Sequence, residues 1–180
     1  MSYTVQVFSP QAEPLLKEHL KTEIERRGFA IAFCAYARTI KEFASDEGPL
    51  SAGFEILVGC ETDSAYAGQF KRIGQTRNIT ALRGMLAAVQ VCQCAISCQV
   101  PYDIGDDWDE EEIEELLESS EPEYVEALRR ARSEYSVQAN IFAGGVEFAA
   151  VVWRAIGAIV GGMLEDAQQD IIEFVNSHES

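Results

Sequence analysis

The sequence predicts an α+β protein, in which short strands and amphipathic helices share one domain. Segments with the two-residue period of a strand are interspersed with segments that have the 3.6-residue period of a helix. Hydrophobic residues make up 47% of the chain and charged residues 24%, which is typical of a globular protein rather than a disordered one. A chain of 180 residues is long enough to bury its own core. We therefore expect a single domain over residues 1–180.

The first hundred residues carry the clearest strand and helix patterns. The first expected helix spans residues 11–27 and stops at Gly28, and a second begins at Thr76 or Asn78. The fourth expected strand is the most regular, because its three cysteines fall on one side and its two glutamines on the other. The expected strands are residues 3–8, 29–36, 54–60 and 91–100.

The order of these elements is β-α-β-β-α-β over residues 3–100. Two right-handed crossovers in this order give a four-stranded antiparallel sheet with both helices on one face. The sequence therefore predicts a ferredoxin-like sandwich as the core of the domain.

A concentrated block of acidic residues follows this core. Between Asp103 and Glu126 there are thirteen acidic residues and no basic one, which leaves 17 acidic residues against 14 basic ones in the rest of the chain. We expect residues 103–133 to form an inserted pair of helices, the first capped by Asp109 with Glu112 and the second by Ser120 with Glu123.

The outer faces of these two helices are the candidate partner-binding surface. An aromatic residue ringed by carboxylates resembles an interaction hot spot, and many like charges within a few Debye lengths would steer a basic partner toward the protein. The candidate residues are Asp106, Asp107, Trp108, Asp109, Glu110, Glu111, Glu114, Glu115 and Glu118. The alternative is that this face serves only to keep the protein soluble.

Residues 135–176 are expected to pack on the core as one strand and two helices. The strand is predicted at residues 135–141. Residues 142–164 are apolar except for Glu147 and Arg154, which indicates a buried helix rather than a membrane span.

The buried helix is expected to end at Gly161 and Gly162. Gly157 and Gly161 allow close packing inside the chain or a contact between two copies of it. A last helix is predicted at residues 168–176.

No pattern in the chain indicates a catalytic residue, a metal site or a cofactor. Motifs for phosphate binding, dinucleotide binding, a serine nucleophile or a zinc protease are absent. Cys92, Cys94 and Cys98 would share one face of a strand but spread over about 20 Å, which is too far for one tetrahedral ion. The first residues show no secretory signal, so we expect reduced thiols in a cytoplasmic protein.

The formal net charge of −16 restricts the partners that the protein could bind. Like charges repel, so nucleic acid and anionic membrane surfaces are disfavoured and a basic protein is favoured. The chain has one basic cluster, Lys71, Arg72, Arg77 and Arg83, which either binds anions or pairs with the acidic helices.

The C-terminal segment from Trp153 to Gln168 resembles the tails of several bacterial families of uncharacterised and immunity-type proteins. In those tails a helix ends at Gly-Gly and an Asp-x-Gln follows, as at Gly161, Gly162, Asp166 and Gln168 here. The proline often found between that Asp and Gln is Ala167 in this chain. The resemblance implies a non-enzymatic protein that neutralises a toxin.

These observations favour a non-enzymatic acidic binding protein, an immunity or inhibitor protein that neutralises a basic toxin or effector. The alternative is a ferredoxin-like ligand-sensing or assembly module that acts as a homodimer through its sheet or its Gly157/Gly161 face. A third hypothesis is a small enzyme that uses a carboxylate pair from Glu55, Glu61 and Asp63.

Overall fold

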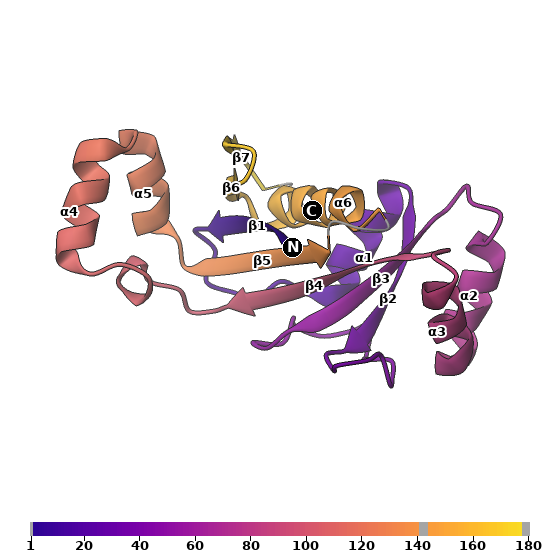
Figure 1. The fold of residues 1–180 in the computed structure, drawn as a ribbon. Helices are drawn as coiled ribbons and strands as arrows, with labels where there is room; N and C mark the ends of the chain where they lie inside the picture. The colour runs from indigo at the N-terminus through magenta and orange to yellow at the C-terminus, as the bar shows by residue number, and fades with distance from the viewer. Residues whose placement is uncertain (1, 141–143, 178–180) are drawn as a thin grey trace.

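The computed structural model describes residues 2–140 and 144–177, in which one antiparallel sheet of seven strands organises the protein (Figure 1). The sheet order is β2-β3-β4-β5-β1-β6-β7. The strands are β1 Ser2–Ser9, β2 Phe29–Ala35, β3 Glu55–Glu61, β4 Cys92–Gln99, β5 Ser133–Asn140, β6 Gly162–Asp166 and β7 Ile171–Val175. The helices are α1 Lys17–Arg26, α2 Ala67–Thr76, α3 Ile79–Ala87, α4 Glu110–Ser119, α5 Pro122–Arg130 and α6 Gly145–Val160, with a short 3₁₀ helix η1 Ile104–Asp106.

Helices α1 and α6 cover one face of the sheet and bury the main core. Alternate residues of the strands point into this layer, as Val5, Phe33 and Val137 do. Trp153 of α6 is buried there, and its Nε1 donates a hydrogen bond to the carbonyl of Gln6 over 2.8 Å. The face that the alternation of apolar residues predicts is therefore the face that packs.

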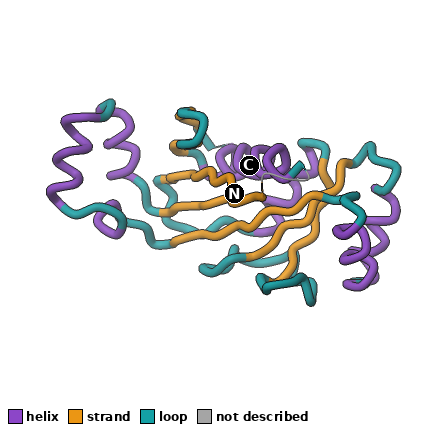
Figure 2. Tube along the Cα trace, viewed as in Figure 1, coloured by secondary structure: helices purple, strands orange, loops and turns teal. Residues whose placement is uncertain are grey.

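The opposite face of the sheet is covered only at its two ends, as far as the described residues show. Helices α2 and α3 pack on this opposite face of β2 and β3. Phe70 and Leu82 of the helices share a buried cluster there with Cys34 and Val58 of the strands. At the far end, α5 packs on Phe8 and other apolar residues. Figures 1 and 2 show the two helical pairs at opposite ends of the sheet. Between them lies a polar strip of paired residues, in which Ser97 faces Ser136 and Ser136 faces Gln6.

The expected ferredoxin-like topology is wrong, although the α+β class is confirmed. In that topology the first strand would lie between the third and the fourth. Here β3 pairs directly with β4, and β1 pairs with β5 on one side and β6 on the other. The position next to β1 is taken by β5, the strand that follows the acidic block. Ser2–Ser9 and Ser133–Asn140 pair over their whole length. Periodicity identifies a strand but does not say which strand pairs with it.

The first helix is shorter than expected and begins at Lys17. The residues before it are held in extended form by the loop after β2: the N–H of Leu50 donates to the carbonyl of Leu15 over 2.9 Å, and Leu16 bridges Pro49. Leu15 is nevertheless buried, as its place in the helical stripe predicts.

The expected last helix is also wrong, because residues 162–175 form the β6–β7 hairpin. Helix α6 does end before Gly161 and Gly162, as predicted. After it, the carboxylate of Asp166 accepts hydrogen bonds from the N–H groups of Gln168 and Gln169, which turns the chain back. The apolar residues of β7 fit a short helix and a strand equally well, so the pattern alone could not decide. Residues 141–143, the expected end of the strand and start of the helix, lie outside the described residues.

Gly157 and Gly161 serve packing within the chain, the first of the two roles considered for them. A Cβ atom at Gly157 would lie 2.5 Å from Cδ1 of Leu164, and one at Gly161 would lie 2.7 Å from the backbone nitrogen of Ser177. The chain itself therefore fills the space at both positions. A homodimer through the polar strip of the sheet stays a prediction. Within the part of the chain that the structure describes, no helix has the length and hydropathy needed to cross a bilayer.

Candidate protein-binding site

The acidic residues form an arm between β4 and β5, which we define as η1, α4 and α5, residues 103–130 (Figure 1). Its base is fixed to the sheet by Tyr102, whose side chain is buried and whose N–H donates to the carbonyl of Arg132 over 2.8 Å. Val125 and Leu128 of α5 are buried, and Leu128 packs in a cluster with Phe8 and Met163. The arm is thus anchored through η1 and α5.

Helix α4 extends away from this anchor and buries none of its residues. It begins at a capping box, in which Asp109 accepts from the N–H of Glu112 and Glu112 accepts from the N–H of Asp109, each over 2.8 Å. Leu117 is 44% exposed. The predicted cap is confirmed. The cap predicted for the next helix is wrong, since Glu121 precedes α5 and makes no side-chain hydrogen bond as a cap.

The first acidic residues of the arm stabilise its own turns. Asp106 accepts from the amide of Gln99 over 3.1 Å and from the N–H of Asp103 over 3.0 Å. Asp107 accepts from the hydroxyl of Tyr102 over 2.9 Å. Together with Asp109 in the capping box, three of the expected partner-binding residues accept hydrogen bonds that stabilise the arm and its base.

The remaining expected carboxylates lie exposed on α4, where no ion pair with another described residue forms. Positions four apart lie on the same side of a helix, so Glu110, Glu114 and Glu118 form one row and Glu111 and Glu115 a second. The ion pair found in the arm is Glu126 with Arg130 on α5, over 2.8 Å. The structure thus brings these five expected residues together as an unneutralised surface.

Trp108 does not stand out from the arm as the expected anchor for a partner. Its side chain is partly buried and packs against the cluster that contains Phe8, Tyr102 and Met163. Burial of an aromatic side chain is favourable on its own, so the tryptophan helps to join η1 to the sheet. Its role in partner binding is therefore limited to the part that remains exposed.

A groove lies beside the arm, between α5 and the β6–β7 hairpin. It encloses about 870 Å³ and is open to solvent. Phe8 and Met163 form its buried floor, and Phe174, which is 53% exposed, stands at its side. Glu123, Glu126 and Arg130 of α5 line the other side, and Glu126 is paired with Arg130 there. We call this the α5 groove. An apolar floor beside carboxylates suits a basic segment that also carries an apolar side chain.

Two glutamates next to the arm are held in surroundings that disfavour their charge. Burial raises the pKa of Glu134, and the nearby Asp107 raises it further, while the hydrogen bond from Gln6 acts the other way. Burial also raises the pKa of Glu165, against the hydrogen bond that the hydroxyl of Tyr124 donates over 2.9 Å. Both reach the sheet surface on which the arm rests, so a cationic partner there would favour their ionised forms.

The structure gives the other candidate groups structural roles. Glu55 and Glu61 lie at opposite ends of β3, about 20 Å apart by the rise of a strand, so they do not form the carboxylate pair considered from the sequence. The three cysteines of β4 share one face as expected, and burial raises the pKa of each thiol. Among the described residues no cluster of histidine, cysteine or carboxylate side chains could hold a metal ion.

The α5 groove was not visible in the sequence. Its outer side is built by β7, which the apolar pattern of residues 171–175 assigned to a helix, and its floor joins Phe8 to Met163 from strands 155 residues apart. The one available signal was the pair of apolar residues Ile172 and Phe174, which are exposed and would have suggested a surface strand.

Comparison of the chain with models of protein families, with curated proteins and with solved structures found no match.

Proposed function

We propose that this protein is a non-enzymatic binding protein that holds a basic segment of a protein partner between its acidic arm and its α5 groove. The observation that supports the proposal is the exposed row of carboxylates on α4, which has no cation from the described part of the chain to neutralise it. A chain with internal arginines across this face would have had little charge to offer. The exposed carboxylates instead point outward from a helix that contributes no residue to the core.

The α5 groove adds a second element to the binding surface. Charge alone steers a partner and sets the salt dependence of binding, whereas a desolvated apolar contact supplies most of the affinity. The exposed ring of Phe174 offers such a contact in the same groove as Glu123. A partner segment with an apolar side chain between lysines or arginines matches both parts.

The narrower form of the proposal is an inhibitor that neutralises a basic toxin or effector. It draws support from the resemblance of the segment Trp153–Gln168 and from the partner chemistry that the arm favours. The motif residues have structural roles: Asp166 is buried and accepts a hydrogen bond from the hydroxyl of Tyr3, and Gln168 bonds the backbone of Ser2 and Thr4. The Asp-x-Gln motif thus joins the hairpin to β1, and the toxin-binding role in this hypothesis belongs to the arm.

The proposal is tested by capture of partners from the native host at low salt, with two charge-reversed variants in parallel. In the first, Glu111, Glu115 and Glu118 of α4 are changed to lysine. In the second, the exposed Glu13, Glu47 and Asp63 are changed to lysine, which alters the net charge equally but far from the arm in the sequence. We expect the first variant to lose the partner by about tenfold or more and the second to retain it.

A partner that both variants retain equally, or that binds as tightly at high salt as at low salt, would contradict the role of the arm. The narrower form is tested next, by expression of the captured partner in a host cell. An inhibitor restores growth when it is co-expressed with a toxic partner, whereas the arm variant does not. A partner that is harmless when expressed alone would rule out inhibition of a toxin and leave the binding proposal in place.

A further inference from the structure

The outer edge of β2 is only partly covered by the rest of the chain. β2 is the first strand of the sheet and has β3 on its inner side. On its outer side, residues 42–44 pair with its C-terminal half: the N–H of Ala44 donates to the carbonyl of Phe33 over 2.9 Å, and the N–H of Ala35 donates to the carbonyl of Glu42 over 3.2 Å. The chain itself therefore adds a short strand to this edge.

The N-terminal half of the same edge has no strand beside it in the described residues. The carbonyl and N–H of one strand residue point to the same side, and alternate residues share that side. Because the carbonyl of Phe33 points outward, both backbone groups of Phe29 and of Ile31 point outward as well. Within the described residues, the N–H groups of Phe29 and Ile31 donate no hydrogen bond. An unpaired edge of this kind is a template for another strand.

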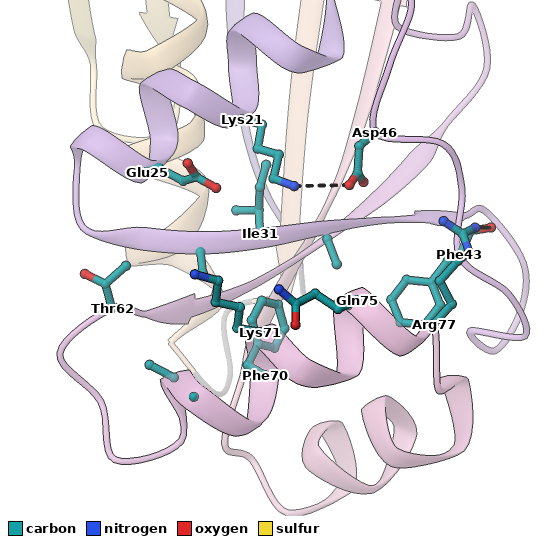
Figure 3. Close-up of a pocket in the computed structure, with 15 residues that line it drawn as sticks. Lys21, Glu25, Ile31, Phe43, Asp46, Thr62, Phe70, Lys71, Gln75 and Arg77 are labelled. Carbon is teal, nitrogen blue, oxygen red and sulfur yellow. Dashed lines mark hydrogen bonds and ion pairs between the residues drawn. The ribbon is translucent and has the colours of Figure 1, made fainter.

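This edge lies at the bottom of a cleft between α1 and α2 (Figure 3). The cleft encloses about 590 Å³, and residues 30–32 of β2 are part of its lining. Lys21 and Glu25 of α1 stand on one side of the strand, and Lys71 and Gln75 of α2 stand on the other (Figure 3). A chain that paired with β2 here would pass between the two helices.

Helix α2 has glycine at two positions that line the cleft. A Cβ atom at Gly68 or Gly74 would meet nothing within 4 Å. Glycine in a helix interior costs about 1 kcal/mol relative to alanine, and no close contact in the chain requires it at either position. Their absence of side chains widens the cleft on the α2 side, which gives space for the side chains of an added strand.

The charge on the α2 side is positive. Residues 64–102 contain four basic residues and no acidic one, in a chain with a net charge of −16. Arg77 is held at the end of the cleft by the carbonyl of Phe43, at 3.0 Å, while Lys71 forms no ion pair with a described residue. On the α1 side, Lys21 is bound to Asp46 over 3.1 Å, and Glu25 adds a negative charge. Only the α2 side thus favours an anion.

We propose that the open edge of β2 accepts an extended peptide segment of a partner protein by β-strand addition, and that the side chains of this peptide that face α2 are acidic. Backbone hydrogen bonds to Phe29 and Ile31 supply recognition of the strand, and Lys71 supplies the preference for acidic residues. The bound peptide lies in line with residues 42–44 along the edge and runs antiparallel to β2. The site lies at the other end of the sheet from the acidic arm (Figure 1), so it does not depend on the function proposed for the arm.

The test uses two labelled peptides with the full-length protein. One peptide alternates valine with glutamate, and the other alternates valine with lysine. We expect the glutamate peptide to bind about tenfold more tightly or better, by fluorescence anisotropy. Saturation with it should slow hydrogen exchange at the amides of Phe29 and Ile31. Equal affinity for the two peptides, no binding of either, or protection of β7 in place of β2 would overturn the proposal.

Three variants locate the binding in the cleft. Gly74→Leu fills the α2 side and should weaken binding about tenfold or more, whereas Gly84→Leu, in the open on α3, is the matched control and should bind as the natural protein does. Lys71→Glu should reverse the preference between the two peptides. If the glycine variants bind alike, the cleft is not the site. If the amides of β2 are already protected in a concentration-dependent dimer without peptide, a second copy covers the edge and the proposal fails.

Discussion

Lys17 of α1 and Glu55 of β3 form an ion pair in the interior, with 6% and 7% of their respective surfaces exposed. The ammonium of Lys17 also donates to the carbonyl of Ser45 over 3.0 Å and lies 5.3 Å from the centre of the Phe33 ring. Charges removed from water are tolerated when each has a partner and further hydrogen bonds. This pair therefore joins α1 to β3 and to the loop between β2 and β3, which contains Ser45.

Removal of one member of the pair should be costly. In Lys17→Met the carboxylate of Glu55 stays buried without its cation, and the free energy of unfolding should fall by about 3 to 5 kcal/mol. The double variant Lys17→Met with Glu55→Leu removes both charges and should recover most of that loss. Urea unfolding of the three proteins measures both effects. A loss that the double variant does not recover would mean that packing, rather than charge, holds this region.

A methyl group at Gly157 should also destabilise the protein. Gly157→Ala places a carbon 2.5 Å from Cδ1 of Leu164, and overpacking of this kind costs about 1 to 3 kcal/mol. The matched control is Gly84→Ala on α3, where nothing lies within 4 Å and the gain in helix propensity should stabilise the protein by up to about 1 kcal/mol. Opposite shifts of the thermal midpoint are expected. A shift of the same sign in both variants would contradict the close approach of α6 to β6.

The sequence predicted local structure better than it predicted the arrangement of the strands. The alternation in β4 and β5 and the capping box at Asp109 follow from neighbouring residues, and all three are found in the structure. The pairing of β1 with β5 depends on contacts between residues more than 120 positions apart, which periodicity does not encode. The exposed carboxylates of α4 could also be predicted from neighbouring residues. The α5 groove could not, because one of its sides is the β6–β7 hairpin, and the short apolar pattern of β7 predicted a helix instead.

The partly buried position of Glu134 predicts that its replacement by neutral glutamine stabilises the protein in a pH-dependent way. Its pKa is raised in the folded protein, chiefly by burial, so its contribution to stability is present at acid pH and is lost as the pH rises through the folded pKa. Glutamine keeps an acceptor for the amide of Gln6, which donates over 2.7 Å. Glu134→Gln should therefore match the natural protein at about pH 4 and be more stable at about pH 7.5. Urea unfolding at both values measures the difference, and a variant that is less stable at the higher pH would refute the assignment.

The like charges of α4 should make the arm more stable as salt is added. Glu110, Glu114 and Glu118 repel at four-residue spacing, which costs about 0.2 to 0.5 kcal/mol per pair at low ionic strength. At about 1 M sodium chloride the Debye length falls to about 3 Å, so this repulsion is screened. We expect slower hydrogen exchange in α4 and a higher thermal midpoint as salt rises. The variant with glutamine at these three positions should be more stable than the natural protein at low salt, and its stability should rise less as salt is added. An equal response in the two proteins would show that salt acts elsewhere, and that the carboxylates of the arm are not the unneutralised charge on which the proposed partner binding depends.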